Sequence, residues 1–190
     1  MIKQLSIRDI DQVVKIHRKE LPGFLSELGE VFLNKFYKVS VDIPEMFTLV
    51  EKENGQICGL ATGTTSTEGL YKKIISKDFL QFILLLLSYF ITHPTKIIKI
   101  GKTLAYPGFS ADNPELLTIA VKRSHQKKGI GRKLFSQIAR EFKKRGVEKF
   151  KISVYDRLPA NGFYKRMGCR FERSFEFLGE KMNYYKYETE

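Results

Sequence analysis

Cysteine and histidine are scarce in this chain, whose 190 residues include two cysteines and three histidines. Cys58 and Cys169 lie far apart in sequence, and neither forms a CxxC pair or has a histidine at the spacing of a zinc site. The sequence therefore predicts no disulfide, no structural metal and a reducing compartment. Both cysteines are expected to be small core residues.

A long apolar run is also missing. The most apolar stretch, residues 79–91, is interrupted by Gln81 and Ser88, whereas a membrane-spanning helix needs about 20 apolar residues. The first residues, MIKQLSIRDID, carry charges where a secretory signal would need an apolar core. We therefore expect a cytoplasmic protein without a transmembrane segment.

Acidic residues are outnumbered, because 33 Lys and Arg against 21 Asp and Glu give a formal net charge of +12. Such an excess favours a polyanionic partner: a nucleic acid, an anionic lipid, or a phosphorylated cofactor or substrate. No helix-turn-helix, RNP or zinc-finger pattern occurs, so we do not expect nucleic acid as the main partner. The length and the apolar fraction of 43% favour one domain over residues 1–190.

The order of the predicted elements indicates a mixed α/β (or α+β) fold with hairpins at both ends. Ser6 is predicted to cap the first helix, with Asp9 three residues on. Asn54-Gly55 favours the positive φ angles of a tight hairpin turn. The predicted strands are residues 2–6, 46–50, 57–62, 115–121, 149–154, 169–177 and 181–188, and the predicted helices are 10–21, 26–40, 79–91, 129–145 and 160–167.

The most informative stretch is the strand at 115–121 with the basic connector and the helix that follow it. Gly129 and Gly131, two apart at the helix start, let the backbone approach a ligand closely. The first N–H groups of a helix are unpaired and carry partial positive charge, which suits a phosphate. The spacing is neither a P-loop nor GxGxxG, and a tight turn with a solvated basic face is the alternative. The basic residues here are Lys122, Arg123, Lys127, Lys128, Arg132 and Lys133.

Gln126-x-x-Gly129-x-Gly131 after an Ile-Ala-Val strand resembles the acetyl-CoA motif of the GNAT superfamily of N-acetyltransferases. ENGQICGLA (53–61) resembles the strand pair before that motif, and NGFYKRMGC (161–169) resembles the family's Asn-x-x-Tyr-(Lys/Arg)-x-x-Gly segment. Three pieces in this order are more specific than any one alone. The resemblance implies a bacterial-type GNAT fold, with a central, mostly antiparallel twisted sheet of about six to seven strands flanked by helices.

The resemblance also implies acetyl-CoA as co-substrate, no metal, and direct attack by a primary amine in a ternary complex. Backbone N–H groups at the helix start would bind the pyrophosphate, and the edge of the preceding strand would pair with the pantetheine amides. A backbone N–H on that edge would hold the charge that develops on the thioester oxygen. The residues implied in cofactor binding are Ile119, Ala120, Val121, Gln126, Lys127, Lys128, Gly129, Ile130, Gly131, Arg132, Asn161 and Tyr164.

Two residues are implied in the chemistry. Tyr164 would protonate the departing thiolate, and Asn161, on the same helix face, would contact the pantetheine arm or its bound water. Simple packing is the alternative for Tyr164. Glu115 is the candidate general base, since some members use a carboxylate on this strand; a solvated strand-end charge is its alternative. Other candidates for the base are Glu20, Glu27 and Glu30, whereas His125 is expected to be a surface residue.

Residues 66–110 form a helical insertion longer than a compact member would have at this place. A helix at 79–91 that is apolar on every face must bury that surface against something. The alternatives for it, in order, are to pack as a lid over the acceptor cleft, to form a homodimer contact and to form a peripheral membrane contact. Among acceptors an amino sugar leads, followed by another small amine and a protein N-terminus or lysine. The second functional hypothesis is a non-catalytic acyl-CoA-binding sensor on the same fold.

Overall fold

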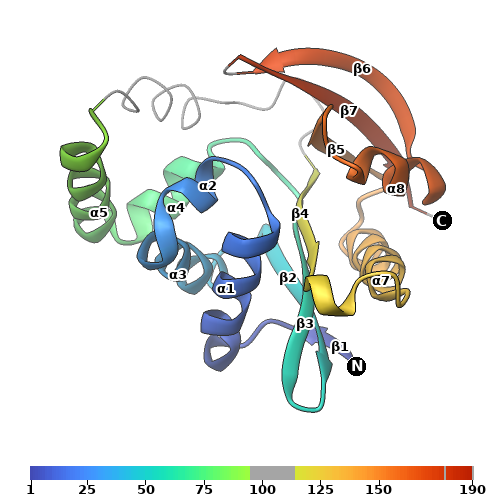
Figure 1. Cartoon of the computed structure of the whole chain (residues 1–190), viewed down its shortest axis with the longest axis horizontal. Coiled ribbons are helices and arrows are strands. Elements are labelled where there is room, and N and C mark those ends of the chain that lie inside the picture. Colours follow the sequence, from blue (N-terminus) through green and yellow to red (C-terminus); the bar gives the residue numbers. More distant parts are fainter. Residues whose placement is uncertain (95–113, 178, 190) are drawn as a thin grey trace.

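The computed structural model describes residues 1–94, 114–177 and 179–189. Its seven strands form one sheet in the order β1-β2-β3-β4-β5-β7-β6 (Figure 1). Every neighbouring pair is antiparallel except β4 and β5, which confirms the predicted mixed α/β, mostly antiparallel sheet. The strands are β1 (Ile2–Gln4), β2 (Met46–Glu53), β3 (Gln56–Thr64), β4 (Glu115–Val121), β5 (Lys149–Tyr155), β6 (Arg170–Phe177) and β7 (Glu180–Glu188).

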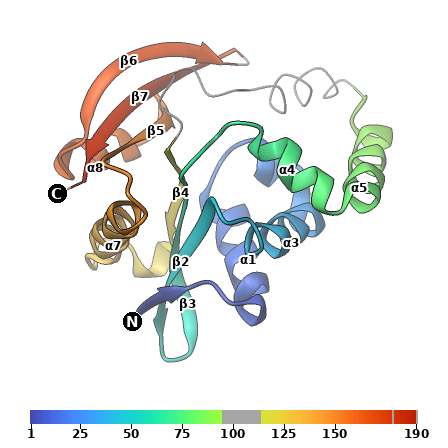
Figure 2. The ribbon, with the colours of Figure 1, turned by 180° about the vertical axis from the view of Figure 1, so that it is seen from behind.

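Helices cover both faces of the sheet and bury a separate apolar cluster on each (Figure 2). Helices α1, α3, α4 and α5 contribute to one cluster, and α7 and α8 to the other. The helices are η1 (Ile7–Asp9), α1 (Ile10–Glu20), α2 (Phe24–Glu27), α3 (Gly29–Ser40), α4 (Leu70–Lys77), α5 (Phe79–Thr92), η3 (Arg123–His125), α7 (Ile130–Lys144) and α8 (Ala160–Arg166).

Glycines on β3 set the position of α7. A Cβ atom at Gly63 would lie 2.7 Å from the rings of Phe142 and Phe47, and one at Gly59 would lie 2.9 Å from Leu134. The absence of a side chain lets α7 pack closely on the sheet. The predicted apolar face of this helix is buried throughout. Its N-terminus is therefore held next to the end of β4.

Two local predictions near the N-terminus were wrong. The predicted helix over 26–40 is broken into α2 and α3, because Gly29 adopts a φ of +87° that a continuous helix does not contain. Ser6 does not cap a helix with its side chain. Its Oγ donates instead to Asp9 Oδ2 at 2.8 Å, and Asp9 also pairs with Lys52 at 2.5 Å.

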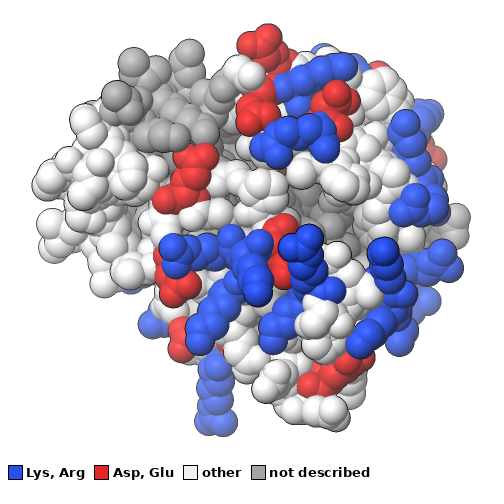
Figure 3. All heavy atoms as spheres, viewed as in Figure 1, with Lys and Arg blue, Asp and Glu red and all other residues white. Residues whose placement is uncertain are grey.

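The helical insertion is confirmed up to residue 94 by α4 and α5, while residues 95–113 lie outside the described residues. Helix α5 buries Phe82 and Leu86 and leaves several other apolar side chains exposed, at an end of the molecule with few charges on the face in Figure 3. No residue of α5 lines the main cleft described below, so this helix is not the expected lid. Within the described ranges no single helix has the length and apolar character to cross a membrane. Helices α4 and α5 have that length and composition only when taken together, and the chain bends by 103° between them.

Candidate active site

The sheet opens between β4 and β5. These parallel strands pair only at Glu115 with Lys151 and at Leu116 with Ile152. Beyond that point β4 continues to Val121 and pairs with β3 alone, after a register shift near Leu117. The edge of β4 that faces β5 is therefore without a strand partner in the described structure, and an extended ligand can pair with it.

The connector after β4 ends in a cradle of unpaired amides, residues 127–132. Lys127 and Gly129 both have positive φ angles, of 61° and 79°. The first helical bond of this turn runs from Lys133 N to Gly129 O at 3.0 Å. Within the part of the chain that the structure describes, the N–H groups of the cradle have no acceptor. Such a group of N–H donors at a helix start is a site for an anion.

Neighbouring elements fix the connector in place. Gln126 Nε2 donates to Val121 O at 3.0 Å, so its side chain ties the connector to the end of β4. The Arg123 N–H donates to Glu20 Oε1 at 3.0 Å, and His125 lies 3.7 Å from Glu53. The cradle is thus braced from α1 and from the β2–β3 hairpin, and the N–H groups of the cradle are held in fixed positions.

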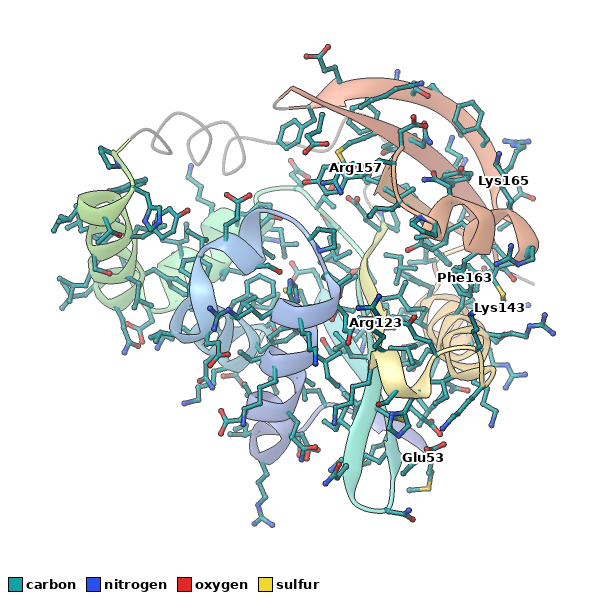
Figure 4. The ribbon with its side chains drawn as sticks, in the orientation of Figure 1. Glu53, Arg123, Lys143, Arg157, Phe163 and Lys165 are labelled. Carbon is teal, nitrogen blue, oxygen red and sulfur yellow. The ribbon has the colours of Figure 1, made fainter. Side chains whose placement is uncertain are left out.

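Positive charge and a close helix contact surround the cradle. A Cβ atom at Gly131 would lie 3.5 Å from the ring of Phe163, which Figure 4 shows between α8 and α7. Lys and Arg side chains gather over η3, the start of α7 and neighbouring α1 (Figure 3). The electrostatic setting therefore matches the multiple negative charges of a pyrophosphate.

A cleft of about 270 Å³ lies beside the free edge of β4. It is bounded by the α1–α2 connection, the first turn of α4, strands β4 and β5, and the β6–β7 hairpin. Three predicted site residues, Glu115, Ile119 and Tyr164, line it together. None of the predicted residues from Gln126 to Arg132 does, because they lie beyond the other end of the β4 edge. Its polar lining is His17, Thr62, Thr67, Tyr71, Glu115, Thr118, Ser153, Tyr155 and Tyr164.

Glu115 is a buried carboxylate in the wall of this cleft, so the alternative of a solvated strand-end charge was wrong. Its Oε1 accepts a hydrogen bond from Ser153 Oγ at 3.0 Å, and its Oε2 lies 3.4 Å from Lys151 Nζ. Burial raises the pKa of Glu115, and Lys151 and Ser153 oppose that shift only in part. A raised pKa makes a carboxylate a better base near neutral pH.

Tyr164 is buried at the cleft with its ring packed on Phe135, Phe163 and Tyr185. Burial, with a smaller contribution from Cys169, raises the pKa of Tyr164. The phenol therefore stays protonated at neutral pH. Its hydroxyl makes no hydrogen bond within the described residues, so it is free to donate to a ligand.

Asn161 has a different place from the one that the resemblance implied. Its Nδ2 donates to the carbonyl oxygens of Tyr155, Asp156 and Leu158 at 2.8–3.0 Å. Its Oδ1 accepts from Asn183 Nδ2 at 2.9 Å and from the Tyr185 hydroxyl at 3.0 Å. No capacity is left in the carboxamide for the pantetheine contact. The side chain holds the turn before α8 and thereby the position of that helix.

The other predicted carboxylates do not line the cleft. Glu20 binds the Arg123 amide, and Glu30 pairs with Arg18 at 2.9 Å on the surface. Glu27 lies at a shallow depression next to the cleft, beside Arg157 and Glu180. Among the described acidic side chains, Glu115 alone faces the main cleft.

Sequence reasoning missed a histidine in the cleft. His17 lines the cleft from α1, and its Nδ1 lies 2.7 Å from the Tyr37 hydroxyl. Burial lowers the pKa of His17 to about 4, so the imidazole is neutral at physiological pH. The one signal in the sequence was its place on the apolar stripe of α1, which is also typical of an ordinary core residue. The Tyr37 partner comes from another helix and was not predictable.

The pKa of His17 predicts a pH dependence of stability. The unfolded chain takes up a proton near pH 6.5 and the folded chain near pH 4, so the unfolded state binds more protons between these values. The free energy of unfolding should fall by about 3 kcal/mol from this group as pH drops from 6.5 to 4, and level off below. Denaturant unfolding of wild type and His17→Gln between pH 4 and 6.5 checks this prediction. The free energy of unfolding of the variant should depend less steeply on pH over this range. Parallel profiles would contradict the assignment.

The open sheet, the cradle and the cleft together define an acyltransferase that takes its acyl group from a CoA thioester. The sequence pattern of the Acetyltransferase (GNAT) family matches residues 10–169, and the chain belongs to this family of acetyl-CoA-dependent enzymes. No curated protein matches the chain in sequence. Among the described residues, no group of three or more His, Cys, Asp or Glu side chains is placed to hold a metal ion.

Solved structures share the fold at low sequence identity. The ribosomal-protein-S18-alanine N-acetyltransferase from Escherichia coli has a TM-score of 0.61 at 15% identity, over 100% of this chain and 93% of that one. An N-acetyltransferase from Staphylococcus aureus Mu50 has a TM-score of 0.67 at 13% identity, and the match covers 100% of this chain and 98% of that one. The PaiA N-acetyltransferase from Thermoplasma acidophilum, solved with coenzyme A, has a TM-score of 0.61 at 14% identity, and the match covers 98% of this chain and 98% of that one.

Proposed function

We propose that this chain, as one domain over residues 1–190, transfers the acetyl group of acetyl-CoA to a primary amine by direct attack in a ternary complex. One observation carries the proposal: the unpaired edge of β4 lies between the cradle, which follows the C-terminal end of the strand, and the cleft that holds Glu115 and Tyr164. A ligand paired with that edge would have its phosphates at one end and its reactive end at the other.

The chain has groups that fit each part of acetyl-CoA, which supplies an acetyl group activated as a thioester. The unpaired N–H groups of residues 127–132 would bind the pyrophosphate, and the nearby lysines and arginines would balance its charge. The β4 edge at Ile119–Val121 would pair with the pantetheine amides. A backbone N–H on the same edge would stabilise negative charge on the thioester oxygen.

Two side chains would move protons. Glu115 would take a proton from the acceptor ammonium, directly or through a water, so that the nitrogen lone pair can attack the acetyl carbon. The C–N bond then forms, the C–S bond breaks, and its electron pair passes to sulfur. Tyr164 would donate its proton to that sulfur. The attacking nitrogen still carries one proton too many once the C–N bond has formed, and that proton would return to the Tyr164 oxygen, directly or through a water. The products are an N-acetylated amine and free CoA thiol.

Calorimetry with acetyl-CoA, followed by thiol-release assays on a panel of primary amines, tests the proposal. We expect binding of acetyl-CoA and amine-dependent thiol release. Binding without turnover on any amine would favour the acyl-CoA sensor instead. No affinity for any CoA species would overturn both, since the cradle would then serve another purpose.

A further inference from the structure

The wall of the cleft carries almost no charge. Glu115 is the single charged side chain among its described lining residues. The described cations Arg18, Lys19 and Arg157 line the adjoining depression and not the cleft itself. Lys151 is fully buried behind the wall and paired with Glu115. A carboxylate or phosphate on the acceptor would therefore be buried beside Glu115 without a free cation, which costs several kcal/mol or more. An ammonium group has a carboxylate oxygen to approach.

Hydrocarbon forms most of the remaining surface. Apolar side chains from the helical layer and from the β6–β7 hairpin line the interior: Leu21, Leu25, Phe36, Leu70, Phe177 and Met182. An apolar acceptor body gains roughly 25 cal/mol for each Å² that it buries here. A polyhydroxylated ring would lose the hydration of several hydroxyls against the same surface.

One neutral hydroxyl in the lining is unsatisfied. Thr67 Oγ1 is buried and makes no hydrogen bond within the described structure, whereas the Thr118 hydroxyl lies beside the hydroxyl of Tyr37. An unpartnered polar atom in the lining can take a ligand atom as its partner. It offers the acceptor one neutral hydrogen bond.

The insertion supplies the end wall of the cleft. Thr67, Leu70 and Tyr71 belong to α4 or to the turn before it, and all three line the cleft. Burial, with a smaller contribution from the Glu115 charge, raises the pKa of Tyr71 to about 12. The charge of Glu115 therefore acts on the Tyr71 phenol across the cleft lining. Helix α4, which carries Tyr71, limits the space around the candidate base. The cleft of about 270 Å³ must hold the acetyl end and the amine end of the acceptor, and it adjoins the depression beside Arg157 and Glu180.

We infer that the acceptor is a compact primary amine with an apolar body and no anionic group, and that α4 of the insertion limits its size. This inference rests on the proposed function and deepens it. It changes the order suggested by the sequence, in which an amino sugar led. The described lining offers no cation to a phosphate, and its exposed surface is mostly hydrocarbon, against which most sugar hydroxyls would lose their hydration.

Thiol release from acetyl-CoA by a matched amine panel tests the inference. We expect kcat/KM for isoamylamine and phenethylamine to exceed that for glucosamine and glucosamine 6-phosphate by about tenfold or more, the factor that about 1.4 kcal/mol of differential binding gives. A preference for glucosamine 6-phosphate or for an amino acid, with acetyl-CoA binding intact, would overturn the inference and leave the proposed function standing. Loss of CoA binding or of all turnover would instead overturn the proposed function.

Variants add a test of the size limit. Leu70→Ala should raise kcat/KM for 4-phenylbutylamine relative to isoamylamine several-fold, and Met182→Ala tests the β7 side of the same cleft at a less buried position. Leu87→Ala, on the exposed face of α5, is the matched control and should leave the ratio unchanged. An unchanged ratio in folded Leu70→Ala and Met182→Ala would contradict the placement of the acceptor.

Discussion

Tyr164→Phe is expected to lower kcat by about 100-fold while the Kd for acetyl-CoA stays within about twofold. General acid catalysis contributes roughly 10²–10⁴ in rate, and the substitution removes only the proton donor. The ring packing on Phe135 and Phe163 is retained, so the fold and the shape of the cleft should persist. Steady-state kinetics with the best amine and calorimetry with acetyl-CoA measure the two effects.

A neighbouring tyrosine provides the control. Tyr185 is buried, lies 6.1 Å from Tyr164 between ring centroids, and donates its hydroxyl to Asn161 without lining the cleft. Tyr185→Phe should therefore cost about 1 kcal/mol of stability and leave kcat nearly unchanged. Equal losses of kcat in both variants would mean that Tyr164 acts through packing, which was the alternative from the start.

Gly129→Val is expected to weaken acetyl-CoA binding by about 100-fold. Gly129 has a φ of +79°, which a β-branched residue adopts only with strain, and the backbone should shift away from its cradle geometry. Each N–H bond to a charged phosphate contributes about 1.5–3 kcal/mol, so losing two accounts for this change. A Cβ atom at Gly129 meets nothing within 4 Å, which excludes a clash with the core as the cause.

Gly146 is a matched control at the other end of the same helix. Its φ is +75°, and a Cβ atom there also meets nothing within 4 Å. Gly146→Val should lower the free energy of unfolding by about 1–2 kcal/mol, as Gly129→Val should, because both residues have a positive φ. Thermal unfolding measures this loss. Gly146→Val should keep its affinity for acetyl-CoA. If both variants bind acetyl-CoA as tightly as wild type, the cradle is not the phosphate site.

The sequence predicted those parts of the site that lie in one continuous stretch. The bounds of the strand Glu115–Val121 and the buried face of α7 follow from local periodicity, and the glycine turn between them from residue types alone. The break at Gly29 was not predicted, because an apolar pattern continues through a residue whose positive φ depends on tertiary packing.

The rest of the site depends on pairings between distant segments. Glu115 and Lys151 meet because β4 and β5 happen to pair in parallel at that one register. His17 and Tyr37 meet across two helices. Local periodicity does not encode either register, so the ion pair, the imidazole in the cleft and the contribution of α4 all had to come from the structure.

The short pairing between β4 and β5 has a consequence for the stability of the folded enzyme. Two residue pairs join the halves of the sheet here, and an acetyl-CoA molecule paired with β4, as proposed, would form hydrogen bonds that β4 and β5 do not make with each other. A ligand present at 100 times its Kd adds about 2.7 kcal/mol to the folded state. The folded protein would then resist unfolding, and proteolysis of the unfolded chain, better while its acyl donor is plentiful than when the donor runs low.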